Sequence, residues 1–183
     1  MSQEIANTIM VSEESINSAF SIYCSIDELK KKLINEIFVP QLKELANKKE
    51  LKFNQCNNPF EQYWNFRFID STKNNMIYAF EFQKKDHKEL LYGIDRYIDR
   101  KPDNHKHQNT ADIKTQYDEY MGDNKENWKK NDWWVIYKYI EKPEYKDWSQ
   151  VAYVDIKNGK LIEYIEKKIS ELQSIAKPIR EIG

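Results

Sequence analysis

The fold of this chain is decided by two stretches of alternating residues, Tyr63-Trp64-Asn65-Phe66-Arg67-Phe68-Ile69 and Met76-Ile77-Tyr78-Ala79-Phe80-Glu81-Phe82-Gln83. In each stretch a large apolar side chain recurs at every second position, which is the period of a β-strand with one face toward a core. The intervening residues, 70–75, are polar and typical of a turn. The two stretches therefore predict an antiparallel hairpin whose apolar face packs against helices.

Two further segments extend this sheet on the sequence pattern. Residues 90–98 follow a charged turn at 84–88, and residues 133–140 alternate well enough for a fourth strand. We therefore expect an antiparallel meander of three to four strands. Its second face is expected to present Arg67, Glu81 and either Asp95 or Arg96.

Helical spacing appears on both sides of the strands. Ser25 and Glu28 form a capping-box pattern, after which apolar residues recur every three or four positions through residue 45. Because proline lacks an amide proton and crowds the preceding turn, this helix should be kinked or interrupted near Pro40. A second amphipathic helix is predicted after Gly159 and should end near Pro178.

Three segments are less regular. Residues 1–24 predict either a short helix or a loosely docked N-terminal arm, and residues 151–156 fit either a strand or a helix that starts near Asp147. Residues 99–130 are polar without sustained periodicity, which predicts a long surface excursion. With 183 residues, the whole chain, 1–183, is expected to form one α+β domain, with amphipathic N- and C-terminal helices packed on the sheet.

Composition narrows the class of protein. Aromatic residues make up 14% and charged residues 32%, which argues against intrinsic disorder. The net charge of −1 does not favour direct nucleic-acid binding. We find neither an apolar run long enough to cross a bilayer nor a secretory signal, so the expected location is cytoplasmic. Cys24 and Cys56 are expected to be reduced thiols.

One charge pattern could carry catalysis. Glu144, which follows a proline, and the pair Asp155 and Lys157 imitate the Pro-Asp…(Asp/Glu)-x-Lys arrangement of Mg²⁺-dependent nucleases, in which two acidic groups hold the metal and the lysine assists the reaction. However, Asp-x-Lys also occurs at 112–114 in this charge-rich chain, so a solvent-facing cluster is the favoured interpretation.

Other chemistry finds less support. His105 and His107, with Asp103 nearby, have a chelating spacing but do not complete a four-ligand zinc set, so we predict no metal. Four glycines in the whole chain leave no phosphate-binding loop, and neither cysteine has a histidine beside it. The expected cofactor is none.

The densest aromatic segment offers a candidate binding site. Trp133 and Trp134 are adjacent, so on a strand their side chains must point to opposite faces, and at least one is expected to lie off the main core. Lys129 and Lys130 precede them and could form a polar rim around an aromatic anchor. The competing interpretation is that both tryptophans are core residues.

The order of these signals resembles the C-terminal half of PD-(D/E)XK-like nuclease proteins of bacteria and prophages. The resemblance covers residues 25–175 and rests on aromatic spacing and the Tyr92-Gly93-Ile94 step. It implies an accessory module without the nuclease core, so no catalytic residue is carried over.

These observations favour a non-enzymatic binding or inhibitor module that acts on a partner protein or a nucleoprotein complex. A module of this kind from a phage or mobile element could inhibit a bacterial defence nuclease or serve as an immunity protein against a toxin. The alternative is a Mg²⁺-dependent nuclease that uses Glu144, Asp155 and Lys157.

Overall fold

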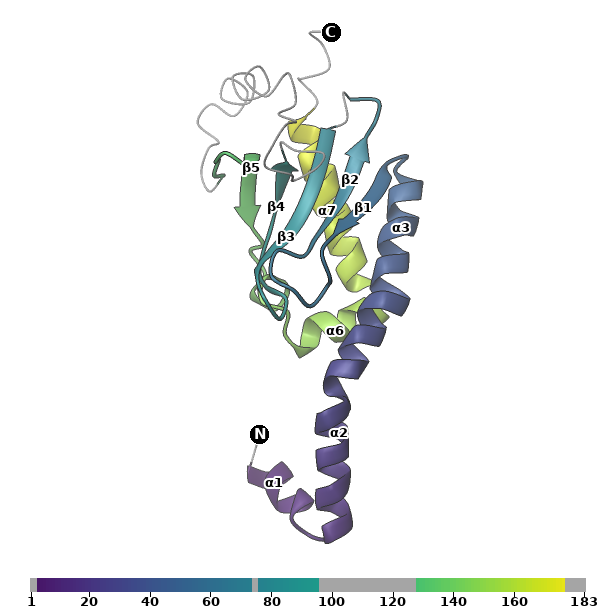
Figure 1. Ribbon diagram of the computed structural model, residues 1–183, viewed down its shortest axis with the longest axis vertical. Coiled ribbons are helices and arrows are strands. Elements are labelled where there is room, and N and C mark those ends of the chain that lie inside the picture. Colours follow the sequence, from purple (N-terminus) through teal and green to yellow (C-terminus); the bar gives the residue numbers. More distant parts are fainter. Residues whose placement is uncertain (1–2, 74–75, 96–127, 177–183) are drawn as a thin grey trace.

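The computed structural model describes residues 3–73, 76–95 and 128–176, which form an α+β fold (Figure 1). Its five strands form one antiparallel sheet in the order β1-β2-β3-β4-β5, so each strand pairs with its neighbours in sequence. The strands are β1 (Lys52–Cys56), β2 (Asn65–Asp70), β3 (Met76–Lys84), β4 (Lys88–Asp95) and β5 (Trp134–Tyr139). The predicted fold class and meander are confirmed, with one strand more than expected.

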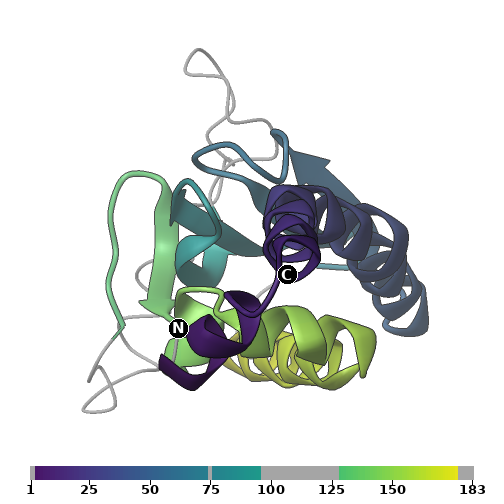
Figure 2. The ribbon, with the colours of Figure 1, turned by 90° about the horizontal axis from the view of Figure 1, so that it is seen from below.

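The helices occupy both ends of the chain. They are α1 (Gln3–Ile9), α2 (Glu13–Lys32), the π-helical segment η1 (Leu33–Phe38), α3 (Val39–Lys48), α5 (Pro143–Lys146), α6 (Gln150–Lys157) and α7 (Lys160–Ile175). Helices α3, α6 and α7 lie over one face of the sheet, whereas α1 and most of α2 project away from it (Figures 1 and 2). None of the described helices is both long and apolar enough to cross a membrane.

Two predicted boundaries were wrong. The first long helix begins at Glu13 rather than near Ser25: Ser12 caps it by accepting a hydrogen bond from the Ser15 amide, and the Ser25 hydroxyl donates to the Ser21 carbonyl inside the helix. Strand β1 lies at residues 52–56, for which the sequence pattern predicted no strand. Residues 151–156 adopt the second of their two predicted states, a helix.

The expected interruption near Pro40 takes the form of η1. In this segment the Val39 amide donates to the carbonyl of Ile34, which is five residues earlier, whereas in an α-helix the acceptor is four residues earlier. The wider turn lies directly before Pro40, whose ring would crowd the carbonyl four residues earlier in a regular helix. Helices α2 and α3 are therefore joined without a loop.

The helix-covered face of the sheet is a row of aromatic residues. Phe66 on β2, Phe80 on β3 and Tyr92 on β4 are register partners, and their rings stack with centroids 5.0 Å and 6.0 Å apart. Phe38 of η1 meets Phe66 edge-on at 5.7 Å. Large apolar area and favourable ring geometry thus act together in the core.

The second face of the sheet is also buried, which corrects the expected exposure of its charges. Arg67 and Asp95 form a salt bridge of 3.0 Å with both side chains fully buried, and Glu81 is only 2% exposed. Arg67 lies opposite Ala79, which lies opposite Gly93, so two small residues leave room for the arginine to cross β3. Burial makes this ion pair sensitive to the loss of either partner.

Gly93 is required by the close approach of β5. A Cβ atom placed on it would lie 2.1 Å from the Ile136 carbonyl oxygen and 2.8 Å from the Tyr137 Cα, both backbone atoms that cannot move alone. We predict that Gly93→Ala lowers the free energy of unfolding by about 3 kcal/mol, measured by urea denaturation. Gly159→Ala is the control, because nothing lies within 4 Å there and only its positive φ of 76° is strained, at a cost of about 1–2 kcal/mol. Equal losses in the two variants would contradict the prediction.

His87 is buried in a neutral form among aromatic rings. It is 2% exposed, stacks on Trp148 at 4.8 Å, and its Nδ1 lies 3.0 Å from the Tyr153 hydroxyl of α6. Burial lowers the pKa of His87 from 6.5 to about 4.

This lowered pKa makes stability depend on pH. Between pH 6.5 and 4 the unfolded chain binds a proton at this site and the folded chain does not, so stability falls as the pH falls. We predict a loss of about 2 kcal/mol from pH 7 to pH 5, measured as the free energy of unfolding. His87→Asn, which tolerates the left-handed backbone at this position (φ 57°), should lack this component, and an unchanged pH dependence in the variant would refute it.

Candidate interaction surface

The two tryptophans of the predicted binding site lie in different environments. Trp134 is 2% exposed and packs with Ile77, Ala79 and Leu91 on the second face of the sheet, whereas Trp133 is 44% exposed. The amides of both residues donate to the Asn131 side-chain oxygen at 2.9 Å, which fixes their backbone at the start of β5. Trp133 is therefore largely exposed, and Trp134 belongs to the smaller core cluster on the second face.

The predicted lysine rim takes part in contacts of the sheet. Lys129 and Lys130 are exposed, but the Lys129 backbone pairs with Tyr137 through two hydrogen bonds of 2.8 Å, and its ammonium lies 5.6 Å from the Tyr139 ring. This pairing extends the sheet beyond β5 at one point. Of the four residues of the predicted site, Trp133, Lys129 and Lys130 are exposed, and Trp134 is buried.

Alanine substitution separates the roles of the two tryptophans. Trp134→Ala should lower the free energy of unfolding by about 3–5 kcal/mol, because it removes a buried side chain. Trp133→Ala should cost about 1 kcal/mol or less. Guanidinium denaturation measures both, and equal losses would show that Trp133 is also a core residue.

The residues of the nuclease hypothesis lie on helices rather than on neighbouring strands. Glu144 is on α5, and Asp155 and Lys157 are on α6. Asp155 is 8% exposed and accepts a hydrogen bond of 2.7 Å from the Tyr145 hydroxyl, and burial together with this bond raises the pKa of Tyr145. Lys157 is exposed. The geometry thus gives Asp155 a structural contact within α5 and α6.

Metal ligands do not come together in the part of the chain that is described. Across residues 3–73, 76–95 and 128–176, no group of three His, Cys, Asp or Glu side chains could hold an ion. The pair His105 and His107, with Asp103, lies outside the described residues. Cys24 and Cys56 are free thiols, as expected.

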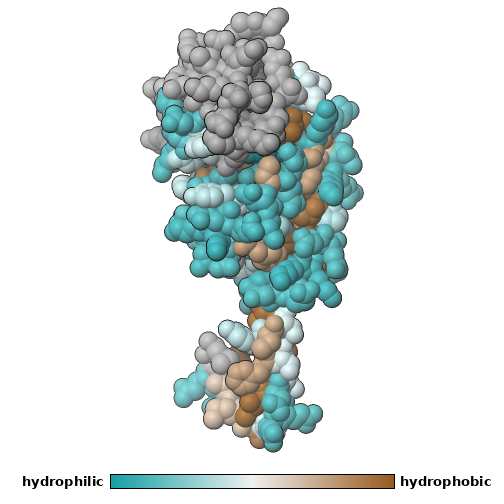
Figure 3. Space-filling view, viewed as in Figure 1, coloured by the Kyte–Doolittle hydropathy of each residue, from teal (hydrophilic) through white to brown (hydrophobic). Residues whose placement is uncertain are grey.

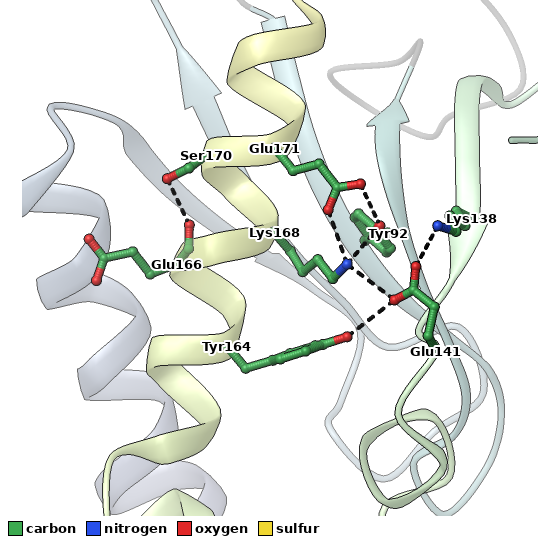
Figure 4. Close-up of polar contacts among 8 residues, drawn as sticks. All are labelled: Tyr92, Lys138, Glu141, Tyr164, Glu166, Lys168, Ser170 and Glu171. Atoms are coloured by element: carbon green, nitrogen blue, oxygen red, sulfur yellow. Dashed lines mark hydrogen bonds and ion pairs between the residues drawn. The ribbon is translucent and has the colours of Figure 1, made fainter. Parts of the chain in front are cut away.

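A network of polar groups joins α7 to the sheet (Figure 4). The Lys168 ammonium lies 3.1 Å from Glu141, 3.0 Å from Glu171 and 3.1 Å from the Tyr92 hydroxyl. Burial opposes ionisation of Glu141, but hydrogen bonds from Lys138 and Lys168 outweigh it and lower the pKa of Glu141 to about 2. Two ammonium groups face two carboxylates here, so the network is balanced and fastens α7 in place.

A second contact fastens α3 to α7. Glu166 accepts a hydrogen bond of 2.9 Å from Lys48 of α3. Within α7, the Ser170 hydroxyl donates to the Glu166 carbonyl (Figure 4). The hydrogen bond from Lys48 lowers the pKa of Glu166. The bond between Lys48 and Glu166 thus helps to hold α3 against α7.

The feature that these contacts do not explain is residues 3–32, which comprise α1, α2 and the turn between them and which we call the arm. Neither helix buries a single side chain, although the arm is rich in large apolar residues. Figure 3 shows apolar surface along the part that projects from the body. Nine of the thirteen exposed large apolar residues in the described chain belong to it: Ile5, Met10, Val11, Ile16, Phe20, Ile22, Tyr23, Ile26 and Leu29.

The arm is amphipathic. Residues 15–26 carry no charge, and Ile16, Phe20 and Tyr23 recur at a spacing of three to four residues on one side of α2. The opposite side carries small polar groups such as Ser18, Ser21 and Ser25. The sequence shows this periodicity, but a stripe of this kind ordinarily predicts packing within the same domain.

Comparisons with protein-family models, with curated proteins and with solved structures found no match to this chain. The resemblance to PD-(D/E)XK-like proteins therefore stays a prediction, and the function is argued from the surface.

Proposed function

We propose that the protein is a non-enzymatic binding module and that the arm is its docking surface for another protein chain. The observation that carries this proposal is the exposed apolar side of α2, where Ile16, Phe20 and Tyr23 are 36%, 65% and 74% exposed. A contiguous apolar patch larger than a few hundred Å² on a folded protein marks an interaction site. An amphipathic helix of this kind meets its partner through residues spaced three and four apart.

Charge supports a protein partner over nucleic acid. The arm begins with Glu4, Glu13 and Glu14, and the whole chain carries a net charge of −1. Phosphate backbones are bound by clustered basic residues, which this end of the arm lacks. Inhibition of a defence nuclease and neutralisation of a toxin are two forms that the binding could take, and both stay predictions.

Substitution on the arm tests the proposal without harming the fold. Because α2 buries no side chain, Phe20→Ser/Tyr23→Ser should leave the free energy of unfolding within about 1 kcal/mol of the parent value. The tagged protein should capture a partner from cells that express the chain, an untagged copy of itself included, and the double variant should lose that capture.

The matched control is Val151→Ser/Val154→Ser on α6, where both valines are 50% exposed but lie outside the arm. The proposal would be refuted if the control variant lost capture as much as the arm variant does. It would also be refuted if the arm variant kept its capture. Incubation with DNA and RNA in Mg²⁺ or Mn²⁺ tests the nuclease alternative, which requires cleavage that disappears in Asp155→Asn.

A further inference from the structure

The size of the exposed stripe matches a stable interface. An aromatic side chain such as Phe20 or Tyr23 contributes about 150–250 Å². With the seven aliphatic residues of the arm, whose exposures are 36–78%, the exposed apolar area is on the order of 1,000 Å². A stable protein–protein interface buries about 800 Å² on each partner. Because a partner helix lies against one side of α2, it would cover the part of this area around Ile16, Phe20 and Tyr23.

Charges on the arm are separated by sign along its length. Three carboxylates, Glu4, Glu13 and Glu14, lie at the tip, and three ammonium groups, Lys30, Lys31 and Lys32, lie at the base. Residues 15–26 between them are uncharged. Asp27 and Glu28 reduce the positive charge at the base, where Lys30 pairs with Asp27 at 3.2 Å.

Within one copy the tip and the base cannot neutralise each other. Seventeen or eighteen residues of helix separate Glu13 and Glu14 from Lys31 and Lys32, or about 27 Å, which exceeds the screening length of about 8 Å at physiological ionic strength. In the described part of the chain, none of these four side chains forms an ion pair. The lysines also precede η1 and α3 without a break, so a helix end does not account for them.

A second copy in antiparallel orientation satisfies both ends at once. The tip of each arm then meets the base of the other, and the uncharged apolar middles meet each other. Parallel arms would instead bring six carboxylates together at one end. Because the arm projects away from the sheet, the two bodies would lie at opposite ends of the paired helices (Figure 1).

We infer that the arm binds the arm of a second copy of this chain, antiparallel, and so forms a symmetric dimer. This inference rests on the proposed function, since it names the partner of the same surface. It satisfies the rule for two-fold interfaces, in which one patch must complement itself.

A membrane surface fits the arm less well. Helices that lie on anionic membranes carry lysine and arginine along their polar face. Here the polar face of residues 13–29 holds serine, asparagine and carboxylates, and the lysines are confined to the base. Vesicle binding is therefore an outcome that would overturn the inference.

Charge reversal tests the orientation. The wild-type chain should sediment at twice the monomer mass at low ionic strength. Glu13→Lys/Glu14→Lys and Lys31→Glu/Lys32→Glu should each raise the dissociation constant of the dimer by about tenfold or more, because attraction at both ends becomes repulsion. An equimolar mixture of the two variants should dimerise as well as the wild type, since each tip again meets an opposite base. Far-UV circular dichroism confirms that the helices remain.

Cross-linking locates the interface. Pairing residues 13–14 with residues 31–32 puts the two-fold axis near residue 22, so the two Cys24 residues lie within about 5 Å of each other along the helices. Cys24 is exposed, and in a Cys56→Ser background a short bismaleimide should join two chains through it. The same reagent should join none in the Cys24→Ser variant.

A wild-type chain that is monomeric at every concentration would overturn the inference, as would a dimer that neither charge-reversed pair weakens. A monomer that co-sediments with vesicles would overturn it and assign the stripe to membranes. If the chain is monomeric but Phe20→Ser/Tyr23→Ser still loses capture of another protein, the inference fails and the proposed function stands. If the variant also captures normally, both fail.

Discussion

Phe66, Phe80 and Tyr92 stack across three neighbouring strands, and the rest of the structure is arranged around that row. Because the three are register partners, sliding any strand by one residue would turn its aromatic side chains to the opposite face. Phe38 packs edge-on against the same row, so the N-terminal helix is positioned by the sheet. One set of ring contacts thus determines both strand register and helix placement.

Burial on the second face limits how the sheet can vary. The pair Arg67 and Asp95 is without solvent exposure, so replacing one partner leaves a buried charge, which is costly. Gly93 serves the same region twice, since it admits the β5 backbone and leaves the arginine its path over β3. The two faces of the sheet are therefore stabilised differently. The helix-covered face depends on the buried area of its aromatic rings, and the second face depends on small residues that make room for the charged arginine.

Much of the fold could be predicted because alternation and helical spacing report which side of an element is buried. Strand β1 was not predicted, because Phe53 is its only large apolar side chain and a strand at the edge of a sheet needs little burial. The burial of Arg67 was not predicted, because a charged residue on the polar side of a strand is ordinarily expected to be exposed to solvent. Because Trp133 and Trp134 are adjacent, the sequence predicted that at least one of them lies off the main core. Only the packing of Trp134 against Ile77 shows which of the two is buried. The arm was missed as a site because its stripe has the same pattern as a core helix.

Helix α2 passes into α3 through a single π-helical segment, with no flexible loop between them. Mechanically, the arm is the outer end of a rod whose inner end is clamped beneath the sheet by Phe38 and by Lys48 against α7. A force applied to the tip of the arm would therefore be transmitted to the contact between Phe38 and the aromatic row of the sheet. Because α2 continues into α3, a partner bound to the arm is held at a fixed orientation relative to the sheet.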